Sequence, residues 1–219
     1  PYPLRRQRQM CIRDRLEQFD LNNEVSARAA EAAVKAGTFN VANVEKKRTR
    51  RSPPPPFITS TLQQEASRKL GFSSQQTMRL AQQLYEGVEI GGDTVGLITY
   101  MRTDGVQLAQ EAVSSMRKQI QAEFGEAYLP VAPRIYQSKA KNAQEAHEAI
   151  RPTDIALKPE KVARMLNAEQ AKLYELIYKR ALACQMSPAE LDQTAVDLTD
   201  GAGQTLRATG SVLAFDGFL

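Results

Sequence analysis

Two residues with complementary chemistry, Tyr100 and Arg102, lie two positions apart in an apolar segment of the chain. Side chains at positions i and i+2 of an extended segment point to the same face, so the two groups are predicted to project together. A phenol, with a pKa of about 10, attacks a phosphorus centre at neutral pH only when nearby positive charge stabilises the phenolate and the transition state. A guanidinium supplies that charge and binds phosphate oxygens through two hydrogen bonds. The spacing alone more often reflects packing on a half-buried strand, so the chemical interpretation needs further support.

That support comes from the longer motif around the tyrosine, Gly96-Leu-Ile-Thr-Tyr-Met-Arg-Thr-Asp104. The motif resembles the active-site segment of type IA DNA topoisomerases. The resemblance implies that Tyr100 becomes covalently joined to the 5′ phosphate of a cut single strand. It implies that Arg102 belongs to the same catalytic site.

A second motif, His147-Glu-Ala-Ile-Arg-Pro-Thr153, contains the only histidine of the chain. A single histidine is more often structural than catalytic, but this motif also resembles one of the type IA topoisomerases. The resemblance implies that His147 and Arg151 approach the DNA backbone near the tyrosine. Protonated histidine and arginine donate charge-assisted hydrogen bonds to phosphate, which suits that role. The residues that follow the tyrosine and the histidine resemble bacterial topoisomerase I more than topoisomerase III.

The composition is that of an ordinary globular protein, with 219 residues of which 42% are hydrophobic and 25% charged. No apolar run approaches about 18 residues and no signal pattern opens the chain, so a cytoplasmic protein without membrane contact is expected. The two cysteines, Cys11 and Cys184, belong to no Cys/His cluster, which argues against a zinc site and a disulfide framework. Residues 1–15 hold five arginines and one aspartate, which accounts for the net charge of +4. Binding of nucleic acid must therefore depend on local groups.

The chain is expected to fold as an α+β protein in four parts. Residues 1–15 show no periodicity and are expected to be foreign or disordered, although a basic arm that binds nucleic acid is an alternative. Residues 16–56 are predicted to form a helix and a strand, and residues 57–186 a mainly helical, helix-turn-helix-like domain that carries the tyrosine. Residues 187–219 are predicted to form further strands. The resemblance implies that the strands of the second and fourth parts belong to an arch domain.

Local signals set the expected limits of these elements. The first helix is predicted to begin after Asn22 or Asn23 and to stop at Gly37, and a strand is predicted from residue 38 to 44. The basic run at 45–51 is either a solvated strand end or a phosphate contact. Further helices are predicted as follows: from a Ser60 cap to Gly71, from Ser73 to Gly87, from about 107 to 124 with Asp104 as cap, and two within 159–184. A hairpin is predicted around Gly201.

The resemblance implies an enzyme that cleaves one DNA strand through a 5′-phosphotyrosine intermediate, passes a strand and reseals the break. Such an enzyme relaxes negatively supercoiled DNA without ATP, acts on single-stranded and negatively supercoiled DNA, and is expected to be monomeric. The family binds Mg²⁺ through an acidic cluster in an N-terminal domain. This chain has no Asp-x-Asp cluster, and none of its residues is predicted to bind the metal. By itself the chain is therefore expected to be inactive.

Two interpretations of other classes remain open. A non-catalytic, winged-helix-like DNA-binding module would account for the predicted helix pair. A purely structural fragment would account for the balanced charge beyond residue 15. Both leave the two motifs unexplained.

Overall fold

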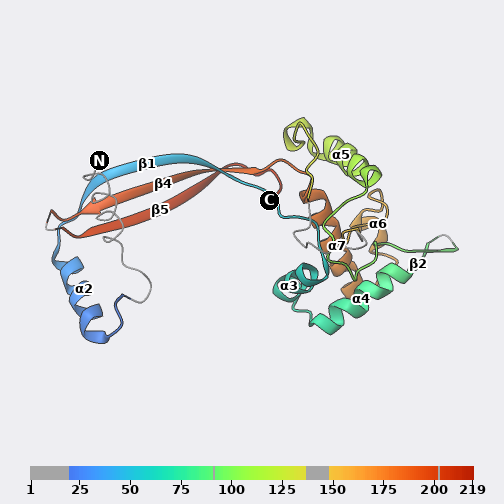
Figure 1. The fold of residues 1–219 in the computed structure, drawn as a ribbon, viewed down its shortest axis with the longest axis horizontal. Helices are drawn as coiled ribbons and strands as arrows, with labels where there is room; N and C mark the ends of the chain where they lie inside the picture. Colours follow the sequence, from blue (N-terminus) through green and yellow to red (C-terminus); the bar gives the residue numbers. More distant parts are fainter. Residues whose placement is uncertain (1–19, 91, 137–147, 202) are drawn as a thin grey trace, which may run out of the picture. The chain divides into compact units, whose positions relative to one another are not determined.

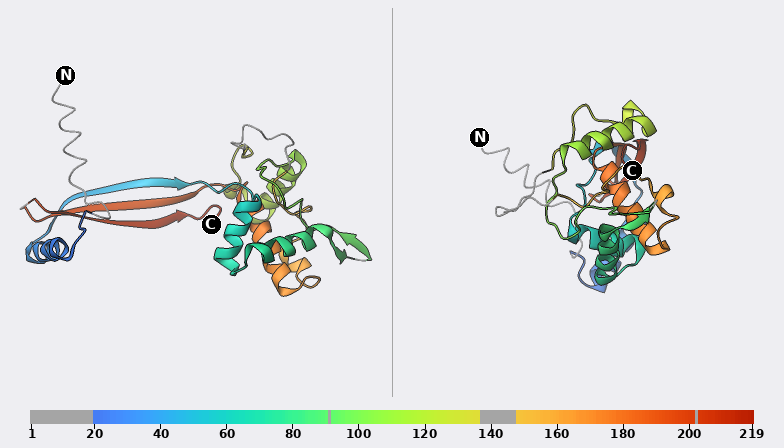
Figure 2. Two further views of the ribbon diagram at one scale, coloured as in Figure 1. Left: turned by 60° about the horizontal axis from the view of Figure 1, so that its bottom comes forward. Right: turned by 90° about the vertical axis from the view of Figure 1, so that its right-hand side faces the viewer.

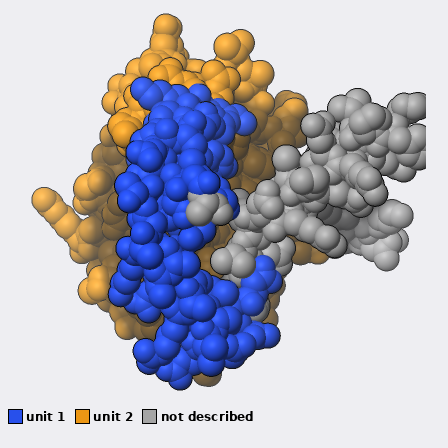
Figure 3. All heavy atoms as spheres, turned by 90° about the vertical axis from the view of Figure 1, so that its left-hand side faces the viewer, with its two compact units in different colours: residues 1–47, 193–211 blue, residues 48–192, 212–219 orange. Residues whose placement is uncertain are grey.

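The structure is a computed structural model that describes residues 20–90, 92–136, 148–201 and 203–219. The chain folds into two compact units, which are coloured separately in Figure 3. The first unit comprises residues 1–47 and 193–211, and the second comprises residues 48–192 and 212–219. Among the described residues, no helix combines the length and the apolar character needed to cross a membrane.

The first unit contains helix α2 (Glu24–Ala36), which follows the predicted limits. Asn23 is the N-cap residue, and its side-chain oxygen accepts a hydrogen bond of 2.9 Å from the backbone N–H of Ser26. The helix ends where Gly37 donates its N–H to the carbonyl of Ala33. Both ends are thus set by local capping, which explains why the sequence predicted them.

A three-stranded sheet in the order β1-β4-β5 is built from long strands that run through both units. Its strands are β1 (Asn40–Arg51), β4 (Ala189–Thr199) and β5 (Thr205–Phe215). Strand β1 extends through the basic run at 45–51, for which a solvated strand end and a phosphate contact were the two predicted alternatives. Acidic residues on β4 explain the extension, because Arg48 pairs with Asp192 at 2.8 Å and Arg50 with Glu190 at 2.9 Å. Opposite charges on neighbouring strands stabilise the pairing of those strands.

The second unit is mainly helical, and its helices gather around α7, as Figures 1 and 2 show. Helix α7 packs against each of the other α-helices in the described part of the unit. The elements are α3 (Thr59–Leu70), α4 (Ser74–Glu86), β2 (Val88–Ile90), β3 (Asp93–Val95), α5 (Gln110–Phe124), a 3₁₀ turn (Glu126–Tyr128), α6 (Pro159–Val162) and α7 (Ala168–Ala183). Strands β2 and β3 pair antiparallel. The mixture of helices and strands confirms the predicted α+β class.

The core of the second unit is formed by apolar faces of α3, α4, α5 and α7 together with the segment before Tyr100. Its fully buried side chains include Leu62, Leu80, Leu84, Leu97, Met101, Ile120, Tyr174 and Ile177. The hydroxyl of Tyr174 donates to the carbonyl of Leu157 at 2.6 Å, which satisfies its polar group inside the core. The helices therefore provide a packed support for the residues on either side of Tyr100.

Two helix starts in this unit differ from the prediction. Helix α3 begins at Thr59, one position before the predicted cap Ser60, and the hydroxyl of Thr61 accepts the backbone N–H of Ile58. Helix α5 begins at Gln110, three positions later than predicted, and Asp104 does not cap it. By contrast, α4 begins after Ser73, whose hydroxyl accepts the N–H of Gln76 at 3.1 Å, as predicted.

Candidate active site

The segment that carries Tyr100 lies directly beside the segment that carries Arg151, although the two are far apart in the sequence. Three contacts join them: the antiparallel bridge between Ile98 and Pro152, the hydrogen bond from Thr99 N to Arg151 O (2.9 Å), and the one from Thr153 N to Leu97 O (3.0 Å). The structure thus brings together the two motifs that the sequence analysis selected. A tyrosine next to such a junction is held by backbone contacts on its N-terminal side.

Thr99 strengthens this junction through its side chain. Its hydroxyl donates to the carbonyl of Ala149 at 2.7 Å and accepts the N–H of Arg151 at 3.0 Å. The residue immediately before Tyr100 is therefore fixed by side-chain and backbone bonds to the same segment. Thr99 was not predicted from the sequence, because its partners lie about 50 residues away and have no local signal.

The residues from Met101 to Asp104 alternate between buried and exposed positions. Met101 and Thr103 are buried, whereas Tyr100 (40% exposed) and Arg102 are on the surface. The predicted extended strand is wrong at this point, because the backbone bends at Met101 and Arg102 and only the bridge at Ile98 is strand-like. The alternation nevertheless leaves both the phenol and the guanidinium accessible to solvent.

An aromatic contact holds the ring of Tyr100 against α4. The rings of Tyr85 and Tyr100 meet edge to face, with centroids 5.3 Å apart and an interplanar angle of 66°. This geometry is favoured for aromatic pairs and adds to the area they bury. Gly96 permits the close approach, since a Cβ at that position would lie 2.7 Å from the carbonyl oxygen of Tyr85. The contact between Tyr85 and Tyr100 was not predicted from the sequence.

Arg102 lines a hollow of about 360 Å³ at the beginning of α3. Thr59 fixes the backbone here, because its hydroxyl donates to the carbonyl of Met101 at 2.8 Å and accepts the N–H of Thr103 at 2.9 Å. The backbone N–H of Thr59 also donates to the carbonyl of Thr103. The bend that presents Arg102 is therefore tied to the first turn of a helix, where the partial positive charge of the helix end favours anions.

The guanidinium of Arg151 is already engaged by its own segment. Its Nε and Nη2 donate to the two carboxylate oxygens of Glu148 at 2.5 and 2.9 Å, and Nη1 donates to the carbonyl of Pro152 at 2.8 Å. Glu148 also accepts the N–H of Ala109, which is the N-cap residue of α5. The side chain of Arg151 is only 14% exposed. The Glu148–Arg151 pair thus links the second motif to α5, and the role of Arg151 in DNA binding stays a prediction.

His147, the remaining predicted site residue, lies outside the described residues. The described chain resumes at Glu148.

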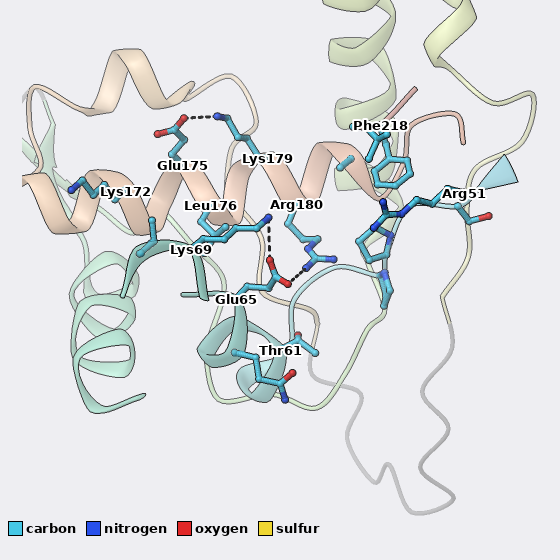
Figure 4. Close-up of a pocket in the computed structure, with 17 residues that line it drawn as sticks. Arg51, Thr61, Glu65, Lys69, Lys172, Glu175, Leu176, Lys179, Arg180 and Phe218 are labelled. Carbon is cyan, nitrogen blue, oxygen red and sulfur yellow. Dashed lines mark ion pairs between the residues drawn. The ribbon is translucent and has the colours of Figure 1, made fainter. Parts of the chain in front are cut away.

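A second surface feature of this unit is the groove between α3 and α7 shown in Figure 4, with a volume of about 960 Å³. It holds cations and anions together. Glu65 pairs with Lys69 at 3.1 Å and with Arg180 at 3.8 Å, and Glu175 pairs with Lys179 at 2.6 Å. The two carboxylates therefore pair with part of the positive charge that lines the groove.

Among the described residues, no group of three or more histidine, cysteine, aspartate or glutamate side chains is arranged so that it could hold a metal ion.

Comparison with known proteins agrees with both motifs. The DNA topoisomerase family matches residues 4–219. DNA topoisomerase 1 from Rickettsia felis is 53% identical over 205 residues, which is 93% of this chain and 26% of the relative. The corresponding protein from Zymomonas mobilis is 55% identical over 206 residues, 94% of this chain and 16% of the relative. The chain thus spans about a quarter, or less, of the length of these curated relatives.

A solved structure gives the same result for the fold. The full-length topoisomerase I from Thermotoga maritima superposes with a TM-score of 0.72 at 41% sequence identity, covering 88% of this chain and 31% of that structure. The family match extends over nearly the whole sequence and includes both motifs. The chain therefore belongs to the type IA DNA topoisomerase family.

Proposed function

We propose that this chain is the nucleophile-bearing portion of an enzyme that relaxes negatively supercoiled DNA by cutting, passing and resealing one strand. The observation that carries the proposal is the junction of the two motifs, which presents Tyr100 on the surface while Thr99 and Tyr85 hold it on two sides. Positioning of this kind is what a phosphoryl transfer requires.

The proposed reaction exchanges one phosphodiester for another. The oxygen of Tyr100 attacks the backbone phosphorus, and the bond between phosphorus and the 3′ oxygen of the preceding ribose breaks. The phenolic proton leaves to a base, and the departing 3′ oxygen takes up a proton. The reverse attack by the 3′ hydroxyl restores the strand and the free phenol. No ATP is consumed, because the energy of the broken bond is kept in the phosphotyrosine and relaxation is driven by the supercoil.

Arg102 is proposed to bind the phosphate that Tyr100 attacks. Its exposure and its position over the hollow at the start of α3 support this role. In Arg102→Lys we expect the rate of strand cleavage to fall by about 10- to 100-fold, since a point charge does not reproduce the two-pronged contact as charge develops on the phosphate. Single-turnover cleavage measures the rate, and equilibrium binding of the same oligonucleotide measures the affinity. Arg164→Lys, at an exposed site on the same unit, is the control. If Arg102→Lys lowers the rate and the affinity equally, Arg102 only anchors the DNA.

His147 and Arg151 are proposed to contact the DNA backbone. For Arg151 this requires an exchange of partners, because Glu148 now occupies two of its donor groups. In Glu148→Gln we expect the unfolding free energy to fall by about 1–3 kcal/mol, the cost of a weakened partly buried charged hydrogen bond. We expect single-stranded DNA to bind more tightly, since the guanidinium becomes available to phosphate.

Thermal unfolding and fluorescence anisotropy with a labelled oligonucleotide measure these two effects. Glu111→Gln is the matched control, because it removes an exposed carboxylate of α5 that forms no ion pair with a described residue. If Glu148→Gln lowers stability without any gain in DNA affinity, Arg151 is a structural residue and its proposed DNA contact is wrong.

Mg²⁺ and a general acid or base are proposed to come from another part of the enzyme, the N-terminal domain. When bound there, the metal would neutralise charge on the phosphate. The long strands β1, β4 and β5 are proposed to belong to an arch domain. The proposed substrate is negatively supercoiled DNA with single-stranded regions. We propose that the enzyme is cytoplasmic and acts as a monomer.

The alternative function, a non-catalytic DNA-binding module, has the helix pair α3–α4 in its favour. It gives no reason for the bonds that fix Tyr100 at the surface. The experiment that separates the two functions is relaxation of a negatively supercoiled plasmid by the full-length enzyme with Mg²⁺ and without ATP. We expect relaxation by the wild type and none by the 219-residue chain alone. A wild-type enzyme that binds DNA but never relaxes it would favour the binding module.

A further inference from the structure

A pocket of about 800 Å³ lies between α5 and residues 129–136 of the second unit. We refer to it as the α5 pocket. Its described lining includes three cationic side chains, Arg117, Lys118 and Arg134, and no aspartate or glutamate. None of the three forms an ion pair with a described residue, which contrasts with the paired charges of the groove in Figure 4. The described lining of the α5 pocket thus holds cations without any carboxylate to pair with them, whereas the groove in Figure 4 also holds Glu65 and Glu175.

Arg117 carries an unsatisfied donor at this pocket. Its Nη2 donates to the carbonyl of Pro130 at 2.8 Å, but its Nη1 is buried and has no hydrogen-bond partner among the described residues. A buried cationic donor without a partner is costly, because it has lost water and gained nothing in return. An anion bound beside the guanidinium would offset that cost.

The opposite wall of the pocket is rigidly built. Gln185, which is 0% exposed, donates to the carbonyl of Arg134 at 3.0 Å and accepts the N–H of Arg134 at 3.1 Å. The Nε of Arg134 donates to the carbonyl of Met186 at 3.0 Å. These bonds fix the direction of the guanidinium and leave its two Nη groups without a described partner. The cation is thus preorganised for a ligand.

Tyr136 completes this wall with an aromatic ring. Its hydroxyl donates to the carbonyl of Cys184 at 2.8 Å, and burial raises the pKa of Tyr136 to about 12, so the phenol stays neutral. Apolar side chains of Val113 and Leu129 and the amide of Gln110 also line the pocket. Cations beside an aromatic ring and apolar surface are the combination that binds single-stranded nucleic acid, whose phosphates need charge and whose bases need a surface to stack on.

The α5 pocket is also connected to the active-site junction. Gln107 lines the pocket, and its carbonyl accepts the N–H of Ala149 at 2.9 Å, next to Glu148. Glu148 in turn accepts the N–H of Ala109 at the start of α5. A DNA strand joined to Tyr100 through a single phosphotyrosine bond would make a second contact with the same unit if it also entered this pocket.

We propose that the α5 pocket binds a phosphate group and the adjoining base of single-stranded DNA, as a second contact for the strand that Tyr100 cuts. The assignment rests on the proposed function insofar as DNA is the substrate. Arg117, Lys118 and Arg134 hold the phosphate, and Tyr136 with its apolar neighbours receives the base.

The test uses the full-length enzyme with Tyr100→Phe as background, so that binding is measured without cleavage. A fluorescent single-stranded oligonucleotide is titrated at several salt concentrations. Lys118→Glu is the informative variant, because Lys118 is exposed and forms no hydrogen bond or ion pair with a described residue that its loss would break. We expect about fivefold weaker binding and a decrease of about 1 in the slope of log K against log salt, as for the loss of one phosphate contact. Lys118→Arg keeps the charge and should restore both values.

Arg164→Glu is the matched control, since it makes the same change of charge on the same unit away from the α5 pocket. Equal weakening by Lys118→Glu and Arg164→Glu would overturn the assignment, because total charge would then explain the effect. An unchanged affinity and salt slope in Lys118→Glu would overturn it as well. Neither outcome bears on strand cleavage by Tyr100, which the unmodified enzyme tests separately.

Discussion

In the full-length enzyme, Tyr100→Phe is expected to abolish strand cleavage while changing the affinity for single-stranded DNA by no more than about threefold. In the proposed reaction only the phenolic oxygen of Tyr100 carries the phosphoryl group, so its removal leaves no nucleophile. The phenylalanine ring still fills the position against Tyr85, where the two centroids lie 5.3 Å apart. Binding depends on cations elsewhere in the enzyme and should persist.

Cleavage is measured as a protein-linked band on a denaturing gel, with an oligonucleotide labelled at its 3′ end so that the strand joined to the protein is visible. Tyr128→Phe serves as the control, because it also removes one phenolic oxygen from the same unit, in this case one that donates to Asp216 at 2.8 Å. That control should retain the band. A protein-linked band in Tyr100→Phe would remove Tyr100 from the role of nucleophile.

Gly96→Ala is expected to produce the second-largest loss of cleavage. The new methyl group would lie 2.7 Å from the carbonyl oxygen of Tyr85, which belongs to the backbone of a packed helix and has little freedom to move. The segment that leads to Tyr100 must shift instead, which costs about 1–3 kcal/mol of stability. A displacement of the nucleophile by about 1 Å lowers the rate by about 100-fold.

Single-turnover cleavage at saturating DNA separates this loss of rate from any loss of binding. Gly210→Ala provides a matched substitution, because a Cβ at Gly210 meets no atom within 4 Å. It should cleave DNA at the wild-type rate. If Gly96→Ala cleaves as fast as Gly210→Ala, the close approach of the Tyr100 segment to α4 does not position the nucleophile.

Elements with purely local signals were predicted well from the sequence. Helices α2 and α4 begin directly after Asn23 and Ser73, because those side chains accept N–H groups three residues later in the chain. Helix α5 was placed too early because its start depends on Glu148, which lies 39 residues further along the chain. No pattern within the helix itself reveals such a partner.

The same distinction applies to the candidate site. The i, i+2 spacing predicted that Tyr100 and Arg102 project together, and both are exposed in the structure. The catalytic roles of these two residues stay predictions. The positioning contacts of Thr99 and Tyr85 were missed, because they join residues that tertiary structure alone brings together. The engagement of Arg151 by Glu148 was missed although the two are three residues apart, since the motif suggested a different partner for the arginine.

The most direct test of the account identifies the residue that carries the DNA. The covalent complex of the full-length wild-type enzyme is trapped, digested with nuclease and trypsin, and sequenced by tandem mass spectrometry. Cleavage after Arg79 and Arg102 yields one peptide that contains both Tyr85 and Tyr100, so the fragment ions decide between neighbouring phenols. The account predicts a nucleotide linked through phosphate to Tyr100. A nucleotide on Tyr85, or on any residue outside this peptide, would contradict it.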